Sequence, residues 1–62
     1  MKVKLRRIEL GIQQQELAKK LGIGRGTLLK IEKGNYDNVK IGLAKNIAKV
    51  LDMSVEELFL KE

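Results

Sequence analysis

The sequence contains no cysteine, no histidine and no proline. Without cysteine it forms no disulfide, and without cysteine or histidine it lacks the conventional ligands of zinc. No stretch approaches the about 18 consecutive apolar residues of a membrane span, and the N-terminus lacks the long apolar core of a signal peptide. The lack of cysteine also fits a reducing compartment. We therefore expect a cytoplasmic protein with no membrane segment, no metal and no cofactor.

The chain is also short, at 62 residues. A chain of this size buries only about 60% of the surface that its unfolded form exposes, so its stability margin is small. We expect a single domain over residues 1–62, stabilised by helix packing, with self-association as a further source of stability.

Acidic residues are scarce in most of the chain. Residues 1–49 contain 12 Lys and Arg against 4 Asp and Glu, whereas residues 50–62 contain one Lys against 4 acidic residues. The two parts carry +8 and −3, which gives the net charge of +5. A polyanion would approach the first part. An ordinary solvated basic surface is the alternative that charge alone leaves open.

The apolar periodicity predicts an all-α chain of five helices, over residues 2–10, 14–21, 25–33 and 39–51 and from residue 54 onward. Gly11, Gly22 and Gly34 follow the first three helices, where glycine favours the left-handed conformation that ends a helix. Ser54 and Glu57 have the spacing of a capping box for the last helix.

Apolar side chains define the inward faces of these helices. In the first helix Val3, Arg7 and Leu10 share one face. In the fourth, the expected inward residues are Ile41, Ala44, Ile47, Ala48 and Leu51. Either Asp37 or Asn38 is available to cap the fourth helix.

Residues 14–34 give the most informative pattern. Two short amphipathic helices are joined by a tight glycine turn, and the second carries Arg25, Lys30 and Lys33. This is the pattern of a helix-turn-helix, whose second helix lies in the DNA major groove. The run Gly22-Ile23-Gly24-Arg25-Gly26 is better explained as helix punctuation than as a phosphate-cradling loop, because no strand precedes it.

In order and spacing, the chain resembles the helix-turn-helix domains of phage repressors and Cro proteins, often called the Xre family. The resemblance covers about residues 3–59. The segments that carry it are Gly11-Ile12-x-Gln14, Glu16-Leu17-Ala18, Leu21-Gly22-Ile23, Ile31-Glu32-x-Gly34, Ile47-Ala48-x-x-Leu51 and Ser54-Val55-Glu56-Glu57-Leu58-Phe59. It implies a compact five-helix fold whose second and third helices form the helix-turn-helix. It also implies binding to double-stranded DNA as a homodimer.

The resemblance assigns base reading to two residues of the recognition helix, 25–33. Arg25 lies in its first turn, and a guanidinium pairs well with guanine O6 and N7. A phosphate contact is its main alternative, followed by simple surface charge. Lys30 lies on a groove-facing position and could reach a base or a phosphate.

Further residues match positions that hold the DNA backbone. Gln14 begins the second helix, where a helix N-terminus favours anions; a solvated polar side chain is the alternative. The expected phosphate-binding residues are Gln14, Gly24, Thr27, Lys33, Asn35 and Lys40. The loop between Asn35 and Lys40 is about one residue longer than in the common family form, which leaves the start of the fourth helix open.

Two charged residues lie on inward faces, and the resemblance implies that Arg7 and Glu32 form a buried structural ion pair. Gly26 and Leu29 depart from the family pattern. Gly26 presents no side chain, which either lowers specificity, lets the backbone approach the duplex, or marks an unused position. Leu29 either touches a thymine methyl group or is a neutral surface residue.

The apolar residues of the C-terminal part exceed what a small core readily hides, namely Leu43, Val50, Phe59 and Leu60. Because the family dimerises through its last two helices, we expect a homodimer interface that contains Val55, Phe59 and Leu60.

These features predict a sequence-specific transcriptional regulator, in particular a repressor that occupies a two-fold symmetric operator. The chain has no room for a separate ligand-sensing domain, so no small-molecule ligand is expected. The alternative is a protein-interaction module or antitoxin that mainly binds a partner protein. An enzyme is disfavoured, because Glu56 and Glu57 diverge on a helix and no catalytic residues accompany them.

Overall fold

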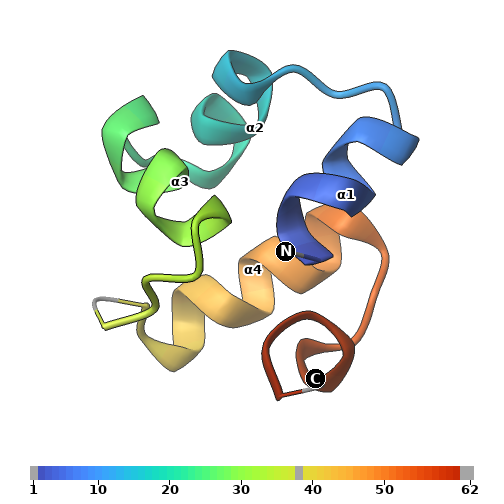
Figure 1. Cartoon of the computed structure of the whole chain (residues 1–62), viewed down its shortest axis with the longest axis vertical. Coiled ribbons are helices and arrows are strands. Elements are labelled where there is room, and N and C mark those ends of the chain that lie inside the picture. Colours follow the sequence, from blue (N-terminus) through green and yellow to red (C-terminus); the bar gives the residue numbers. More distant parts are fainter. Residues whose placement is uncertain (1, 38, 61–62) are drawn as a thin grey trace.

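The computed structural model describes residues 2–37 and 39–60, with only the backbone of residue 60. Its helices are α1 (Lys2–Glu9), α2 (Gln14–Leu21), α3 (Arg25–Glu32), α4 (Ile41–Leu51) and the π-helical η1 (Glu56–Leu60). No strand occurs among these residues, so the all-α, five-helix prediction is confirmed. Figure 1 shows α2 and α3 together at the upper left, α4 across the lower half and η1 at the lower right.

Each of the four α-helices is followed by a residue in the left-handed conformation. The φ angles are 71° at Gly11, 69° at Gly22, 94° at Gly34 and 57° at Asp52. In each case the next residue donates its backbone N–H to a carbonyl five residues earlier, as Ile23 does to Ala18 at 3.0 Å. This hydrogen bond satisfies a carbonyl group that the helix end would leave unpaired. The glycine positions therefore correctly predicted a left-handed residue after three helices, whereas the residue after α4 is Asp52 rather than a glycine.

The core forms where all five helices meet. The largest fully buried side chains come from each of the four α-helices and are Val3, Leu17, Leu28, Ile31, Ile47 and Leu51. Leu58 of η1 joins them at 2% exposure. Arg6 also connects α1 to the end of α4, because its Nε donates to the Leu51 carbonyl at 2.8 Å. Helices of only eight to eleven residues are marginal alone, so this shared core is what stabilises them.

Several predicted boundaries and faces were wrong. The first helix ends at Glu9, and Leu10 lies beyond it with 41% exposure. The third ends at Glu32, one residue before Lys33. In both cases one residue, Leu10 or Lys33, lies between the helix end and the left-handed glycine.

The fourth helix begins at Ile41 rather than at residue 39, and Ile41 is 67% exposed instead of inward. Lys40 occupies the N-cap position, and no side chain caps this helix. Asp37 therefore does not cap it, and Asn38 lies outside the described residues. Without a capping side chain, nothing in the sequence marked the true start. Leu43 and Val50, expected to exceed the core, are partly buried against it.

The last helix is capped as predicted but has a different backbone. The Ser54 N–H donates to the Glu57 carboxylate at 3.0 Å, and the Glu57 N–H donates to the Ser54 hydroxyl at 3.1 Å. From Glu56 the backbone is π-helical rather than α-helical. This wider coil was outside the prediction, which assumed a 3.6-residue period.

Candidate nucleic-acid interface

The turn between α2 and α3 sets the direction of α3. Gly22 reverses the chain in the left-handed conformation, and Gly24 then takes an extended conformation (φ −74°, ψ 156°) as the N-cap of α3. Between them Ile23 packs against the core. Two glycines and one apolar anchor therefore position α3 against α2, and no side chain of the turn obstructs its outer side.

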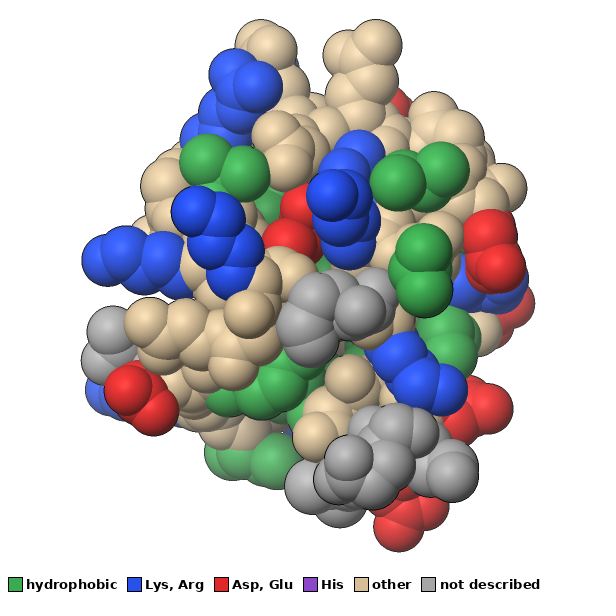
Figure 2. Space-filling view, viewed as in Figure 1, with side chains coloured by type: hydrophobic (Ala, Val, Ile, Leu, Met, Phe, Trp, Pro, Cys, Tyr) green, Lys and Arg blue, Asp and Glu red, His purple; other side chains and the backbone are tan. Residues whose placement is uncertain are grey.

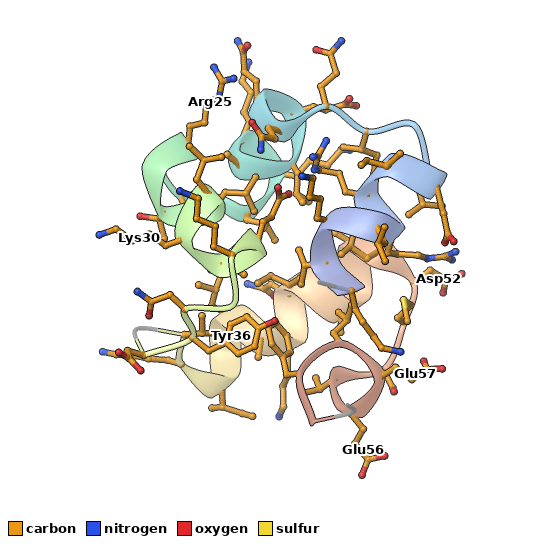
Figure 3. The ribbon with its side chains drawn as sticks, viewed as in Figure 1. Arg25, Lys30, Tyr36, Asp52, Glu56 and Glu57 are labelled. Carbon is orange, nitrogen blue, oxygen red and sulfur yellow. The ribbon has the colours of Figure 1, made fainter. Side chains whose placement is uncertain are left out.

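One face of α3 is buried and the other is open to solvent. Leu28 and Ile31 are at most 1% exposed, so they fix the helix to the core. Arg25 and Lys30 of α3, and Lys33 directly after it, are all exposed. In Figure 3, Arg25 and Lys30 both extend outward from α3 at the upper left of the molecule.

Gly26 and Leu29 also lie on the exposed part of α3. A Cβ atom added to Gly26 would meet nothing within 4 Å, so the helix surface is bare there. Leu29 is 38% exposed. The exposed part of α3 thus carries a cation in its first turn, Arg25, and one in its last turn, Lys30, with no side chain at Gly26.

A buried polar network connects α3 to α1 and α2. Arg7 Nε donates to Glu32 Oε2 at 2.7 Å, and Arg7 Nη1 donates to the Ile12 carbonyl at 2.9 Å. Gln14 Nε2 donates to Glu32 Oε1 at 3.0 Å. Arg7 and Glu32 are 8% and 4% exposed. The structure thus brings this pair together and also holds the Gln14 side chain at the start of α2.

Five of the eight candidate DNA-binding residues line two hollows beside α3. One hollow is lined by Arg7, Gln13, Gln14, Gln15 and Arg25. The other is lined by Thr27, Lys30, Ile31, Asn35 and Val39. Gln14 therefore shares a hollow with Arg25, and Thr27 shares one with Lys30 and Asn35. Gln13 and Gln15 were missed in the sequence, where the run of three glutamines was their only signal.

The loop after α3 is built from short turns. The Asn35 N–H donates to the Lys30 carbonyl at 2.9 Å, and Asn35 Oδ1 accepts the Asp37 N–H at 3.3 Å. Lys33 and Asn35 are exposed at the start of this loop, and Lys40 is exposed at its end. Lys40 is not among the residues lining either hollow.

On the face that Figure 2 shows, the charged side chains are unevenly distributed. Figure 2 shows Lys and Arg side chains gathered at the upper left over α2 and α3, and many of the Asp and Glu side chains toward the right and lower margins. Figure 3 places Asp52, Glu56 and Glu57 away from Arg25 and Lys30. The positive potential is therefore directed outward from the helix-turn-helix.

An apolar hollow of about 270 Å³ lies outside this surface and is lined by Tyr36, Val39, Ile41, Ala44, Val55 and Phe59. It brings together two of the three residues expected at a dimer interface, Val55 and Phe59. Leu60 lies outside the described side chains.

Across the described ranges 2–37 and 39–60, no helix is long and apolar enough to cross a membrane.

An open cationic helix, held against a second helix by a glycine turn, defines a helix-turn-helix protein. A helix-turn-helix family model matches residues 3–58. The chain is 43% identical over 61 residues to an uncharacterised HTH-type transcriptional regulator of Methanocaldococcus jannaschii, covering 98% of this chain and 91% of that one. It is 44% identical over 54 residues to one from Archaeoglobus fulgidus, covering 87% and 76%. YgzD of Bacillus subtilis, also an uncharacterised HTH-type transcriptional regulator, is 38% identical over 61 residues, covering 98% and 91%. No solved structure matches. The chain therefore belongs to the helix-turn-helix family of the Cro/C1 (Xre) type.

Proposed function

We propose that this protein is a sequence-specific, cytoplasmic, non-enzymatic DNA-binding transcriptional regulator that inserts α3 into the major groove. The observation that carries the proposal is the exposed part of α3, which presents Arg25 and Lys30 and is bordered by two hollows that contain further polar side chains. An exposed helix of this kind has the dimensions that the major groove admits. The names of its relatives as transcriptional regulators support the same function.

We assign base reading to Arg25 and Lys30, because both extend outward from α3 (Figure 3). We assign binding of the DNA backbone mainly to residues on either side of that helix. Gln14 and Gly24 lie at helix N-termini, where backbone N–H groups attract phosphate. Thr27 and Asn35 border the second hollow, and Lys33 and Lys40 supply exposed cations. Contacts on both sides of α3 would fix its register on the duplex.

We further propose that the protein acts as a homodimer on a two-fold symmetric operator and represses by blocking promoter access. The apolar hollow that contains Val55 and Phe59 supports this, together with the exposed Ile41 at its edge. Two recognition helices separated by one DNA turn would span about 34 Å. With few base-reading side chains per subunit, pairing of subunits and DNA shape would supply much of the specificity.

Selection of bound sequences from a random DNA pool tests the proposal, because it yields the operator, its symmetry and its half-site spacing together. Arg25→Ala should then weaken operator binding by about 1–3 kcal/mol and relax sequence preference. Gln14→Ala should weaken binding to all sequences alike. Lys49→Ala is the matched control, since Lys49 is exposed in the last turn of α4, next to Asp52. Unchanged operator affinity in Arg25→Ala would refute the base-reading role.

A partner protein could occupy the same apolar hollow instead of a second copy. Tight capture of a partner combined with weak, sequence-independent DNA binding would favour that second function.

A further inference from the structure

The loop between α3 and α4 separates two different surface hollows. On one side lies the hollow that contains the polar side chains of Thr27, Lys30 and Asn35, and on the other lies the apolar hollow that contains Val55 and Phe59. Val39 lines both hollows. A structural change at the apolar hollow can therefore be transmitted to the proposed DNA-binding surface through the residues of this loop.

One aromatic contact connects this loop to the C-terminal segment. The rings of Tyr36 and Phe59 lie 4.9 Å apart between centroids at an interplanar angle of 84°, which is an edge-to-face arrangement. Aromatic pairs prefer this geometry because the positive ring edge meets the negative ring face. The contact joins Tyr36, the residue directly after Asn35, to Phe59 of η1. Burial also raises the pKa of the Tyr36 hydroxyl above its usual value of 10.0.

Three hydrogen bonds of the loop are short-range. Asn35 bonds back to Lys30, Asp37 bonds to Asn35, and the Val39 N–H donates to the Tyr36 carbonyl at 3.0 Å. Asn35 and Asp37 are exposed, so water competes for the bonds of these turns. The ring contact with Phe59 is a long-range link that holds the loop against the body of the protein.

We propose that Phe59 is a positioning residue for DNA binding. Through Tyr36 it holds the loop so that Asn35, and Lys33 just before it, meet the phosphate backbone. This inference rests on the proposed DNA-binding function and adds a residue from the far end of the chain to it. It makes the order of η1 a determinant of DNA affinity within one subunit, before any dimer contact.

The test uses a duplex containing one half-site from the selected operator, at protein concentrations where sedimentation shows a monomer. Phe59→Leu keeps apolar volume but removes the ring. An aromatic pair of this kind corresponds to about a two- to tenfold change in an equilibrium constant, so we expect half-site affinity to fall within that range. Tyr36→Leu should give a similar loss, and the double variant should lose little more than either alone.

A second background separates positioning from general destabilisation. In Asn35→Ala, which lacks one of the two side chains that the loop presents, Phe59→Leu should have a smaller further effect on half-site affinity, because only Lys33 remains to be positioned. Val50→Ala is the matched control, because Val50 is also partly buried against the core but belongs to α4. It should lower stability and leave half-site affinity unchanged. Faster amide exchange at Asn35 and Asp37 in Phe59→Leu would show the loop loosening directly.

Two results would overturn the inference. One is wild-type half-site affinity in Phe59→Leu, and the other is an equal loss from Phe59→Leu in the wild-type and Asn35→Ala backgrounds. If Gln14→Ala and Lys30→Ala weaken binding but Phe59→Leu does not, only the positioning role falls. If none of these variants changes DNA binding, both the positioning role and the proposed function are refuted.

Discussion

At the scale of single residues, Glu32 is where three parts of the molecule meet. Its carboxylate accepts hydrogen bonds from Arg7 of α1 and Gln14 of α2, while its own helix packs into the core. A buried charge is tolerated only when it is paired and hydrogen-bonded. The network therefore leaves the buried carboxylate paired and, in the proposed function, orients a phosphate-binding side chain.

Removing one partner of this ion pair should destabilise the protein more than replacing both. Arg7→Met leaves the Glu32 carboxylate buried without its cation, and such changes cost about 3–5 kcal/mol. The double variant Arg7→Met/Glu32→Leu should recover most of that loss. Urea denaturation of both variants measures the difference. A double variant that is no more stable than the single one would show that the pair itself contributes the stability.

Gly26 offers a separate test of how closely α3 approaches DNA. Gly26→Ala should raise the free energy of unfolding by about 1 kcal/mol, because glycine is a poor helix former and a Cβ atom there has open space. We expect DNA affinity to fall at the same time, since the added methyl group would lie on the groove-facing side. Gly42→Ala in α4 is the control, because it also has open space but should leave DNA affinity unchanged. Equal DNA affinity in all three proteins would mark position 26 as unused.

At the scale of elements, the helix ends carry most of the information about the fold. Three of them use a left-handed glycine, whereas α4 ends at Asp52, which adopts φ 57° with a side chain present. Left-handed conformations are costly for most residues and least so for glycine, aspartate and asparagine.

Asp52→Gly should therefore stabilise the protein by about 1 kcal/mol, seen as a higher urea midpoint at unchanged slope. Asp52→Ala should show no gain, because alanine keeps the steric conflict. If Asp52→Gly were destabilising, the aspartate side chain would have to contribute more than its conformational cost.

The cap of η1 predicts a pH dependence. The Ser54 backbone N–H and then its hydroxyl donate to Glu57, and these bonds lower the pKa of this carboxyl below its usual 4.5. The folded state thus favours the ionised form, so the contribution is present above pH 4.5 and is lost as the pH falls through the lowered pKa. Glu57→Gln should flatten the decline of stability on acidification, measured by urea denaturation across that range. An unchanged decline would show that the cap contributes nothing through charge.

The elements also show what could be predicted from the sequence. The bounds of α2 were predicted to the residue because a glycine follows the helix and its apolar stripe is unbroken. The start of α4 was misplaced because Lys40 marks it with no capping side chain, so the exposed Ile41 was counted as core. The Arg7–Glu32 pair followed from a resemblance, whereas its bond to Gln14 and the Tyr36–Phe59 contact depend on tertiary geometry that no local spacing encodes.

At the scale of the whole molecule, charge is separated by position. The helix-turn-helix side presents Arg25 and Lys30, and the acidic residues 52, 56 and 57 lie away from it (Figure 3). Such a polarised molecule would approach a duplex with α3 leading and keep its acidic end in solvent.

DNA binding should therefore weaken steeply with salt, because each neutralised phosphate releases counterions. Lys33→Ala should reduce the slope of log K against log salt by about 1, and Lys49→Ala should leave it unchanged. Titrations of operator DNA at several salt concentrations give both slopes. Equal reductions in the two variants would mean that net charge, rather than a specific contact, controls affinity.

The Tyr36 ring of the edge-to-face contact is also an intrinsic fluorescence probe. Tyr36 is the one tyrosine of a sequence without tryptophan, so intrinsic fluorescence excited in the tyrosine band comes from this ring. Tyr36 lies in the loop between the hollow that contains Thr27 and Lys30 and the apolar hollow that contains Val55. Events on either side of that loop should change its emission, so unlabelled protein can report DNA binding and self-association separately when each is titrated alone.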